Sequence, residues 1–461
     1  MSKKISPDSL YQLNIEKTAT YLLEKYWNRE DTNPFSQVNC YIVNDLFQFL
    51  VHKLYIVTPI PLELLLKSGQ LQDLDLYEVV FTVEQWKSLM TVLLEEGDSC
   101  RNITSIVLPE SFQNDENSSL ERLIEKCPSL EILDVSTFFS LSALKNCVRL
   151  KYVRNHFSGI TEYMYFWNET VDTLANLQNL AKFDIFHCRN SASYYTLIAK
   201  MLQNHPKLVS LGNTDSSLAA HDIYTTCRID TVPRFGLKEC FWGFNRNVEK
   251  FDRKQIAYTQ QYPQIIKSSV ILFPLLEKLR ILVYHEDCIE HLKKLKHLRV
   301  LEIDLRLCCS SSAHTAFISL LSEIGPQLKR LSIVSYSTIP VDVVMKYCSN
   351  VVHLDLCCSA IVQGGIETDS NNFRQLEKIT VREVDKEALE YFLRNSLKMN
   401  EVLHVPAPCW DDTLLDKIRK CVNLEIVDFE TVIADMTTVE KELKQYIRAT
   451  FSHIEKYLIG I

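Results

Sequence analysis

Hydrophobic residues recur along most of the chain in short strings of the form Leu-x-x-Leu-x-Leu, as at Leu130, Leu133 and Val135. Side chains two residues apart lie on the same face of a β-strand, so each string predicts a short strand with one buried face. The strings begin at Leu71, Ile103, Leu130, Leu150, Leu180, Leu208, Leu276, Leu298, Leu328, Val351, Leu376 and Leu424, with a shortened copy at Leu403 and a poorer copy near Leu237.

The spacing of these strings is nearly regular towards the C-terminus. The last four repeats begin at positions 351, 376, 400 and 424, which are 25, 24 and 24 residues apart. This period is typical of leucine-rich repeats, in which each coil holds one strand and a returning helix or irregular segment. One coil cannot bury its apolar edge alone, whereas stacked coils share a continuous core. The pattern therefore predicts an α/β leucine-rich-repeat solenoid with parallel strands on its concave face.

The segments before and after the repeats have helical rather than strand-like patterns. We expect an N-terminal helical block at residues 1–68, leucine-rich repeats at 69–432 and a C-terminal capping helix at 433–461. Within the last segment, Val439, Leu443 and Ile447 recur at helical spacing. An open solenoid end needs such a cap to keep its core from water.

A cysteine precedes several strings at a constant offset. Cys127, Cys147, Cys348 and Cys421 each stand three residues before the first apolar residue of a string. A constant offset in a repeat indicates a constant structural place, so we expect these thiols to pack as small apolar groups beneath the next coil.

The residues between the apolar positions of each string should point to the concave face. In the first half of the chain this set combines carboxylates, aromatic rings and a few basic groups. It comprises Asp75, Tyr77, Asp134, Phe138, Arg154, His156, Asp184 and Phe186, and the long spacings after Leu150 and Leu237 add Trp167 and Trp242. Carboxylates beside aromatic rings suit a peptide that carries a positive group, whereas an ordinary polar face is the simpler interpretation. Later strings contribute Arg280, Glu302, Arg330, His353 and Asp355 to the same face.

The opening block contains the start signals of a helix. Ser6 can cap it, Pro7 suits its first turn and Asp8 favours the positive end of the helix dipole. Leu10 and Leu13 follow at helical spacing, and a second helical string runs from 40 to 54.

Two stretches of this block resemble the adaptor-binding boxes of the Zyg family of cullin–elongin ligase receptors. Ser9, Leu10, Asn14 and Thr18 stand at the marked positions of an elongin C-binding BC box, and residues 42–46 resemble a cullin box. Asn14 replaces the usual Cys, Thr18 replaces an aliphatic residue and Val43 replaces Pro. The armadillo-type repeats of that family have no counterpart that we find in the sequence.

The resemblance implies that elongin C binds Ser9, Leu10, Leu13 and Asn14, with Leu10 inserted, and that Ile42 and Leu46 help to contact adaptor or cullin. It also implies a substrate-recognition subunit of a cullin-RING ubiquitin ligase, with a protein degron held on the repeats. An F-box protein on a Skp-type adaptor is the alternative, although no Leu-Pro-acidic opening precedes Leu10. A third interpretation is a scaffold or inhibitor whose first helices only cap the solenoid. A cap should bury Leu10 and Leu13, whereas an adaptor box must leave them partly exposed.

The sequence contains no signature of catalysis or cofactor binding. Phosphate-binding and nucleophile motifs are absent, and in "HEDCIEH" His285 and His291 are six residues apart, too far round a helix for a zinc pair. The net charge of -8 argues against nucleic acid as a partner. No secretory signal or membrane-length apolar run occurs, so we expect a cytoplasmic or nuclear protein that is not an enzyme and carries no metal or cofactor.

Overall fold

The structure is a computed structural model of the 461-residue chain. It describes residues 7–24, 33–53, 59–77, 79, 82–95, 100–108, 119–136, 139–155, 174, 177–185, 192–227, 233–243, 253–308, 310–361, 375–381, 386–396, 398–399, 401–405 and 426–429. The expected capping helix at 433–461 lies outside these residues. No described helix combines the length and the apolar character needed to cross a bilayer.

The chain forms two compact units, Met1–Thr214 and Asp215–Ile461, which we call unit 1 and unit 2. The boundary expected at residue 68 falls inside unit 1, where the helical block and the first repeats belong to one body.

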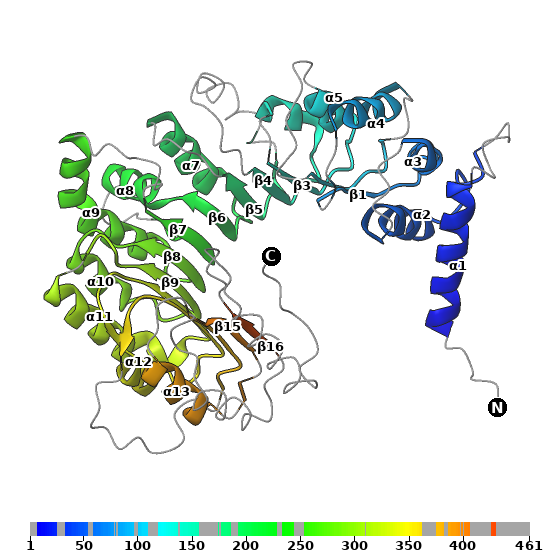
Figure 1. Cartoon of the computed structure of the whole chain (residues 1–461). Helices are drawn as coiled ribbons and strands as arrows, with labels where there is room; N and C mark the ends of the chain where they lie inside the picture. The colour runs from blue at the N-terminus through cyan, green and yellow to red at the C-terminus, as the bar shows by residue number, and fades with distance from the viewer. Residues whose placement is uncertain are drawn as a thin grey trace. The chain divides into compact units, whose positions relative to one another are not determined.

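Unit 1 begins with helices and continues as a parallel sheet (Figure 1). Its N-terminal helices are α1 (Pro7–Leu23), α2 (Cys40–Gln48), the π-helix η1 (Phe49–Lys53) and α3 (Pro59–Leu66). The strands are β1 (Asp73–Asp75), β2 (Ser105–Val107), β3 (Ile132–Val135), β4 (Tyr152–Asn155), β5 (Lys182–Ile185) and β6 (Ser210–Asp215), in that order across the sheet. Between them lie α4 (Val83–Glu95), α5 (Ser119–Glu125), the 3-10 helix η2 (Leu141–Asn146) and α7 (Ala192–Asn204).

Unit 2 also alternates strands and helices, with one α-helix between successive sheet strands from β7 to β12. Its sheet order is β7 (Glu239–Trp242), β8 (Lys278–Leu282), β9 (Val300–Asp304), β10 (Arg330–Val334), β12 (His353–Cys357), β14 (Lys378–Val381), β15 (Glu401–Val405) and β16 (Ile426–Phe429). A small pair, β11 (Ile339–Pro340) and β13 (Ala360–Ile361), lies apart from it. The helices are α8 (Ser217–Thr226), α9 (Arg253–Leu272), α10 (Glu286–Leu292), α11 (Ser311–Ile324), the short η5 (Gly325–Gln327), α12 (Val341–Tyr347) and α13 (Lys386–Asn395).

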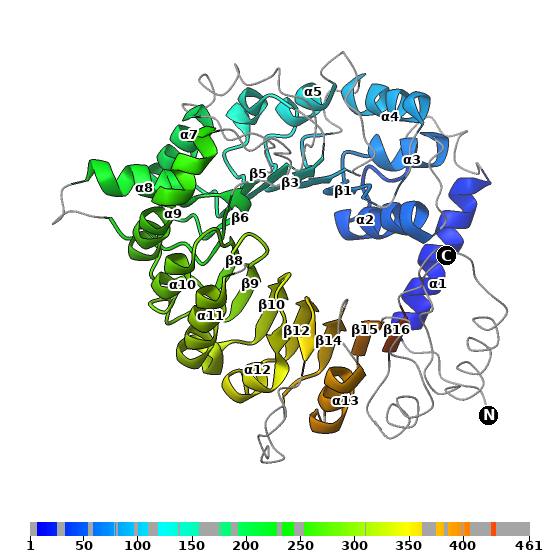
Figure 2. The ribbon, with the colours of Figure 1, turned by 60° about the vertical axis from the view of Figure 1, so that its left-hand side comes forward.

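The strands pair in register, apart from a shift between β15 and β16, and this stacks the apolar positions of the repeats into columns. In unit 2, Leu331 aligns with Leu301 of β9 and with Leu354 of β12, and all three side chains are buried. Helices α10, α11 and α12 lie on one side of β8 to β12, so each strand has one helix-covered face and one open face (Figure 2). The predicted α/β leucine-rich-repeat solenoid is thus confirmed, and the strand at Glu239–Trp242 shows that the poor copy near Leu237 is a true repeat.

The cysteines at the constant offset are buried, as expected. Cys127, Cys147 and Cys348 have no exposed surface. Burial raises the pKa of Cys147 and of Cys348 to about 12, so both thiols stay protonated near neutral pH. Cys421 lies outside the described residues.

Candidate functional site

The helix α2 seals the first strand of the sheet. Val43, Leu46 and Phe47 have no exposed surface. The side chain of Asn44 is also buried, and its Oδ1 accepts the backbone N–H groups of Gln72 at 2.9 Å and of Asp73 at 3.4 Å. These donors lie at the free edge of β1, where no earlier strand can accept them. The expectation for Leu46 was therefore wrong, because a side chain in the core of the cap cannot contact an adaptor.

The helix α1 packs outside this cap, against α2 and η1. Its buried side chains are Ile15, Ala19 and Leu22, which stand four and three residues apart and so share one face of the helix. Tyr11 adds a polar link, since its hydroxyl donates a hydrogen bond of 2.6 Å to Asp45 Oδ2 on α2. This bond, with burial and the charge of Asp45, raises the pKa of Tyr11 to about 12. One apolar face therefore suffices to hold α1 in place.

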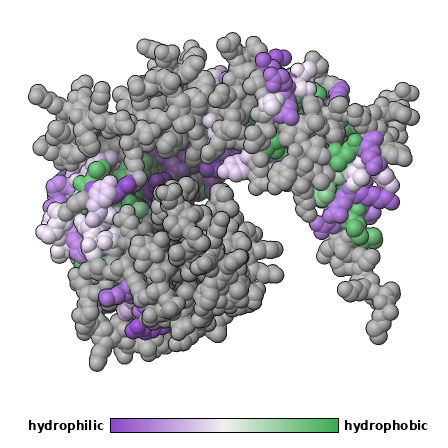
Figure 3. Space-filling view, in the orientation of Figure 1, coloured by the Kyte–Doolittle hydropathy of each residue, from purple (hydrophilic) through white to green (hydrophobic). Residues whose placement is uncertain are grey.

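A second apolar stripe runs along the outward side of α1. The exposed fraction is 56% for Leu10 and 50% for Leu13, and Tyr21 is exposed further along the helix. Lys17 lies between them, with Nζ 5.7 Å from the centroid of the Tyr21 ring. We call Leu10, Leu13, Lys17 and Tyr21 the outer ridge. Figure 3 shows hydrophobic surface at the end of α1 nearest the N-terminus, among polar atoms.

The other expected adaptor residues are distributed between surface and core. Asn14 is exposed on α1, and Ile42 is exposed on α2 beside the more exposed Tyr41. The side chain of Ser9 lies outside the described part of the chain. The binding roles of Ser9, Leu10, Leu13, Asn14 and Ile42 stay predictions, now with Leu46 removed from the set.

The open face of unit 1 carries a row of charges from successive strands. The strand register aligns Asp75 with Val107, then with Asp134, Arg154 and Asp184. Arg154 Nη1 lies 3.2 Å from Asp134 Oδ2. Burial acts to lower the pKa of Arg154, but its charge pairing and hydrogen bond with Asp134 leave that pKa raised. The neighbouring Tyr152 has a pKa raised to about 12, mainly by burial and then by Asp134.

The remaining carboxylates of this row bind the backbone. Asp75 Oδ1 accepts the N–H of Tyr77 at 3.0 Å. Asp184 Oδ1 accepts the N–H of Asn213 at 2.8 Å, where Gly212 adopts a φ of +50°. A Cβ on Gly212 would stand 2.3 Å from Asp184 Cγ, so only glycine allows this approach. The row is thus largely occupied by contacts within the unit, and its use by a positively charged peptide stays a prediction.

The aromatic residues expected beside that row have different positions. Tyr77 is exposed on the turn after β1. Trp242 has no exposed surface, and its ring lies 6.5 Å from that of Phe273. The expectation that Trp242 lines a binding site was therefore wrong, because it fills the third core position of the repeat that starts at Leu237. Phe138, His156, Trp167 and Phe186 lie outside the described residues.

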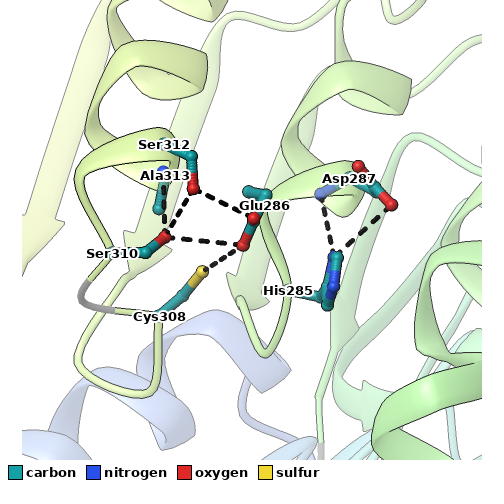
Figure 4. A network of polar contacts seen from close by, with 7 residues as sticks. All are labelled: His285, Glu286, Asp287, Cys308, Ser310, Ser312 and Ala313. Carbon is teal, nitrogen blue, oxygen red and sulfur yellow. Dashed lines mark hydrogen bonds and ion pairs between the residues drawn. The ribbon is translucent and has the colours of Figure 1, made fainter.

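The "HEDCIEH" stretch joins two neighbouring coils. His285 caps α10 by accepting the N–H of Asp287 at 3.3 Å through Nδ1 (Figure 4). Glu286 accepts hydrogen bonds from Ser312 Oγ at 2.9 Å and Ser310 Oγ at 3.5 Å, at the start of α11. These contacts are structural links between helix starts. Among the described residues, no group of three or more His, Cys, Asp or Glu side chains is placed to hold a metal ion.

Comparison with known proteins gives structural neighbours only. No protein-family model and no curated protein sequence matches the chain. A chain in the crystal structure of the Rad7 and Elc1 complex in yeast is similar over 94% of this chain and 96% of its own, with 16% identity and a TM-score of 0.45. The leucine-rich repeat-containing protein LegL7 from Legionella pneumophila is similar over 79% of this chain and 98% of its own, with 12% identity and a TM-score of 0.31.

Proposed function

We propose that this protein is a non-catalytic substrate-recognition subunit of a cullin-RING ubiquitin ligase, acting in the cytoplasm or nucleus. In this proposal an elongin C-type adaptor binds the outer ridge of α1, and the repeats hold a segment of the substrate. The observation that supports it is the double-sided character of α1, which buries Ile15, Ala19 and Leu22 and leaves Leu10 and Leu13 about half exposed.

A cap alone does not account for that second stripe. Sealing β1 is already achieved by α2, and α1 is attached through its buried face and the Tyr11–Asp45 hydrogen bond. Burying the exposed halves of Leu10 and Leu13 in a partner's groove would contribute roughly 2 kcal/mol. Helix-in-groove recognition uses apolar anchors three, four and seven residues apart, and Leu10 and Leu13 have the first of these spacings.

The burial of α2 limits the second half of the resemblance. Val43 and Leu46 are inaccessible, so a cullin-box contact would have to use Tyr41 and Ile42 at the start of the helix. The adaptor contact on α1 is therefore the stronger half of the proposal.

The proposed mechanism is proximity. A receptor that binds adaptor and substrate together raises the effective concentration of a substrate lysine near the loaded conjugating enzyme. The receptor itself then needs no nucleophile, acid or base.

The test is capture of purified adaptors by the purified chain. We expect the chain to retain elongin B/C, and the double variant Leu10→Ala, Leu13→Ala to weaken this by at least about tenfold. Leu307→Ala is the matched control, because Leu307 is also 50% exposed but lies in unit 2. A Skp-type adaptor is tested in parallel. Capture of neither adaptor, or an equal loss with Leu307→Ala, would reject the proposal.

A further inference from the structure

Basic side chains gather along the edge of the unit 2 sheet at which four neighbouring strands, β8, β9, β10 and β12, begin. β8, β10 and β12 begin with a basic residue, and two further basic residues directly precede β9 and β10. This basic row consists of Lys278, Arg299, Lys329, Arg330 and His353, all of which are exposed.

The strand register brings these residues together. Val300 aligns with Lys278 on one side and with Arg330 on the other, and Arg330 aligns with His353. Lys329 lies next to Arg299 on the neighbouring coil, since its backbone N–H donates a hydrogen bond of 2.7 Å to the carbonyl oxygen of Arg299. Neighbouring strands are about 4.8 Å apart, so the row extends roughly 14 Å from β8 to β12.

Most of this positive charge has no ion-pair partner within the described part of unit 2. Lys278 is paired with Glu239 at 2.6 Å. Lys329 and Arg330 form no ion pair with any described residue, and His353 is counted as neutral in the net charge of the chain. Arg299 helps to lower the pKa of Glu277, but that carboxylate is bonded mainly to Lys238, at 2.8 Å.

The contrast with the open face of unit 1 indicates the sign of the ligand. There, Asp134 is paired with Arg154, and Asp184 holds the backbone of Asn213. In unit 2, Arg299, Lys329 and Arg330 form a local positive cluster at the starts of β9 and β10, in a chain whose net charge is -8. A positive cluster on an acidic protein does not add to its solubility. Such a cluster is a feature of surfaces that recognise a negatively charged partner.

We infer that the open face of unit 2, across β8 to β12, binds an extended segment of a partner protein rich in Asp and Glu. Arg330 offers a planar fork for a carboxylate, and Arg299 and Lys329 extend the positive edge. Val300, between Lys278 and Arg330, offers a small apolar contact for an intervening side chain. That this segment belongs to the recruited substrate rests on the proposed function, whereas the binding itself does not.

A protein segment fits this surface better than nucleic acid. A nucleic acid carries a negative charge at every phosphate and would extend past the row. It would then meet the carboxylates of Glu239 on β7 and Glu302 on β9. A short acidic segment stays within the row of roughly 14 Å, which is about the length of four extended residues.

The test measures fluorescence anisotropy of a labelled peptide in which Glu and Ala alternate, added to the full chain. We expect saturable binding that weakens with added salt, and at least about tenfold weaker binding by Arg330→Glu, His353→Glu. The matched control is Lys294→Gln, Lys346→Glu, which lowers the formal charge by the same amount at exposed lysines beside α10 and on α12. The neutral variant Arg330→Gln, His353→Gln should give an intermediate loss.

Several outcomes would overturn the inference. One is an equal loss of peptide affinity in the test variant and in the control variant. Another is tighter binding of the corresponding Lys–Ala peptide. A third is tighter binding of a single-stranded oligonucleotide or a phosphorylated peptide than of the Glu–Ala peptide. A thermal transition is recorded for every variant so that misfolding is recognised. The Leu10→Ala, Leu13→Ala variant should bind the peptide normally, so failure of the adaptor proposal and failure of this inference give different results.

Discussion

Asn44 holds Asp73 from two sides: its Oδ1 accepts the Asp73 backbone N–H at 3.4 Å, and its Nδ2 donates to Asp73 Oδ2 at 3.3 Å. The buried amide of Asn44 therefore supplies the hydrogen-bond acceptor that a preceding strand supplies to later strands of the sheet. The helical block and the repeats are joined at this point by hydrogen bonds as well as by apolar packing.

Replacement of Asn44 by Ala should expose the first strand. The N–H groups of Gln72 and Asp73 would lose their acceptor, at a cost of about 1–3 kcal/mol in the free energy of unfolding. Urea denaturation measures the loss, and hydrogen exchange should accelerate at these two amides. Asn14→Ala, at an exposed position of α1, is the control and should change little. Unchanged exchange in Asn44→Ala would show that the amide does not seal the edge.

Gly212 should not tolerate a side chain. Its φ of +50° and the 2.3 Å between a built Cβ and Asp184 Cγ predict that Gly212→Ala costs about 2 kcal/mol or more. Gly236 has open space around such a Cβ, so Gly236→Ala should change stability by less than about 1 kcal/mol. Chemical denaturation of both variants gives the comparison. Adding Asp184→Ala to Gly212→Ala should recover part of the loss, since it removes the clash but not the unfavourable φ.

The two faces of α1 should respond differently to the same kind of truncation. Ile15→Ala removes a buried side chain and should lower the free energy of unfolding by about 2 kcal/mol or more, whereas Leu13→Ala should lower it by less than about 0.5 kcal/mol. Calorimetry or denaturant unfolding measures both. An equally large loss for Leu13→Ala would mean that Leu13 packs against the protein and is not free for an adaptor.

Stability should fall with rising pH through the titration of Asp215. This buried carboxyl accepts hydrogen bonds from Ser217 N at 2.9 Å and Oγ at 2.8 Å, yet burial outweighs them and raises its pKa to about 6 from 3.8. A raised pKa in the folded state means that the folded protein holds the proton longer than the unfolded chain. The stabilisation is complete below about pH 3.8 and is lost as the pH rises through about 6.

Asp215→Asn keeps an acceptor for Ser217 but does not titrate. The difference in Tm between this variant and the wild type should therefore widen in favour of the variant between pH 4 and pH 6. Thermal unfolding at a series of pH values measures it. Asp222→Asn, at an exposed position of α8, serves as the control. Parallel Tm curves for Asp215→Asn and the wild type would contradict the prediction.

The strands and the core could be predicted from sequence because the repeat encodes them locally. Leu133 or Leu331 marks its strand through neighbours only two or three residues away, and stacking follows from repetition. Trp242 was missed because Cys240 and Trp242 stand where most repeats have aliphatic residues, although their spacing from Leu237 already fitted the pattern.

The surfaces were less predictable because they depend on which elements meet. Ile42 and Leu46 are one turn apart on α2, yet Ile42 is exposed and Leu46 is buried. That difference is set by where the first coil lies beneath the helix, which the sequence of α2 does not carry. Likewise, Asp134 and Arg154 neutralise each other only because the register aligns them, whereas Arg330 aligns with Val300 and His353 and has no such partner among described residues.

The buried cysteines at the constant offset give the protein internal reporters of opening. Cys127 and Cys147 lie in unit 1 and Cys348 lies in unit 2, each sealed from solvent in the closed coil. An alkylating reagent can reach each thiol only when its own coil separates from the next, so the labelling rate at each cysteine measures the frequency of that local event. Mass spectrometry of labelled peptides would then show which turns of the stack part first under stress, without introducing any probe.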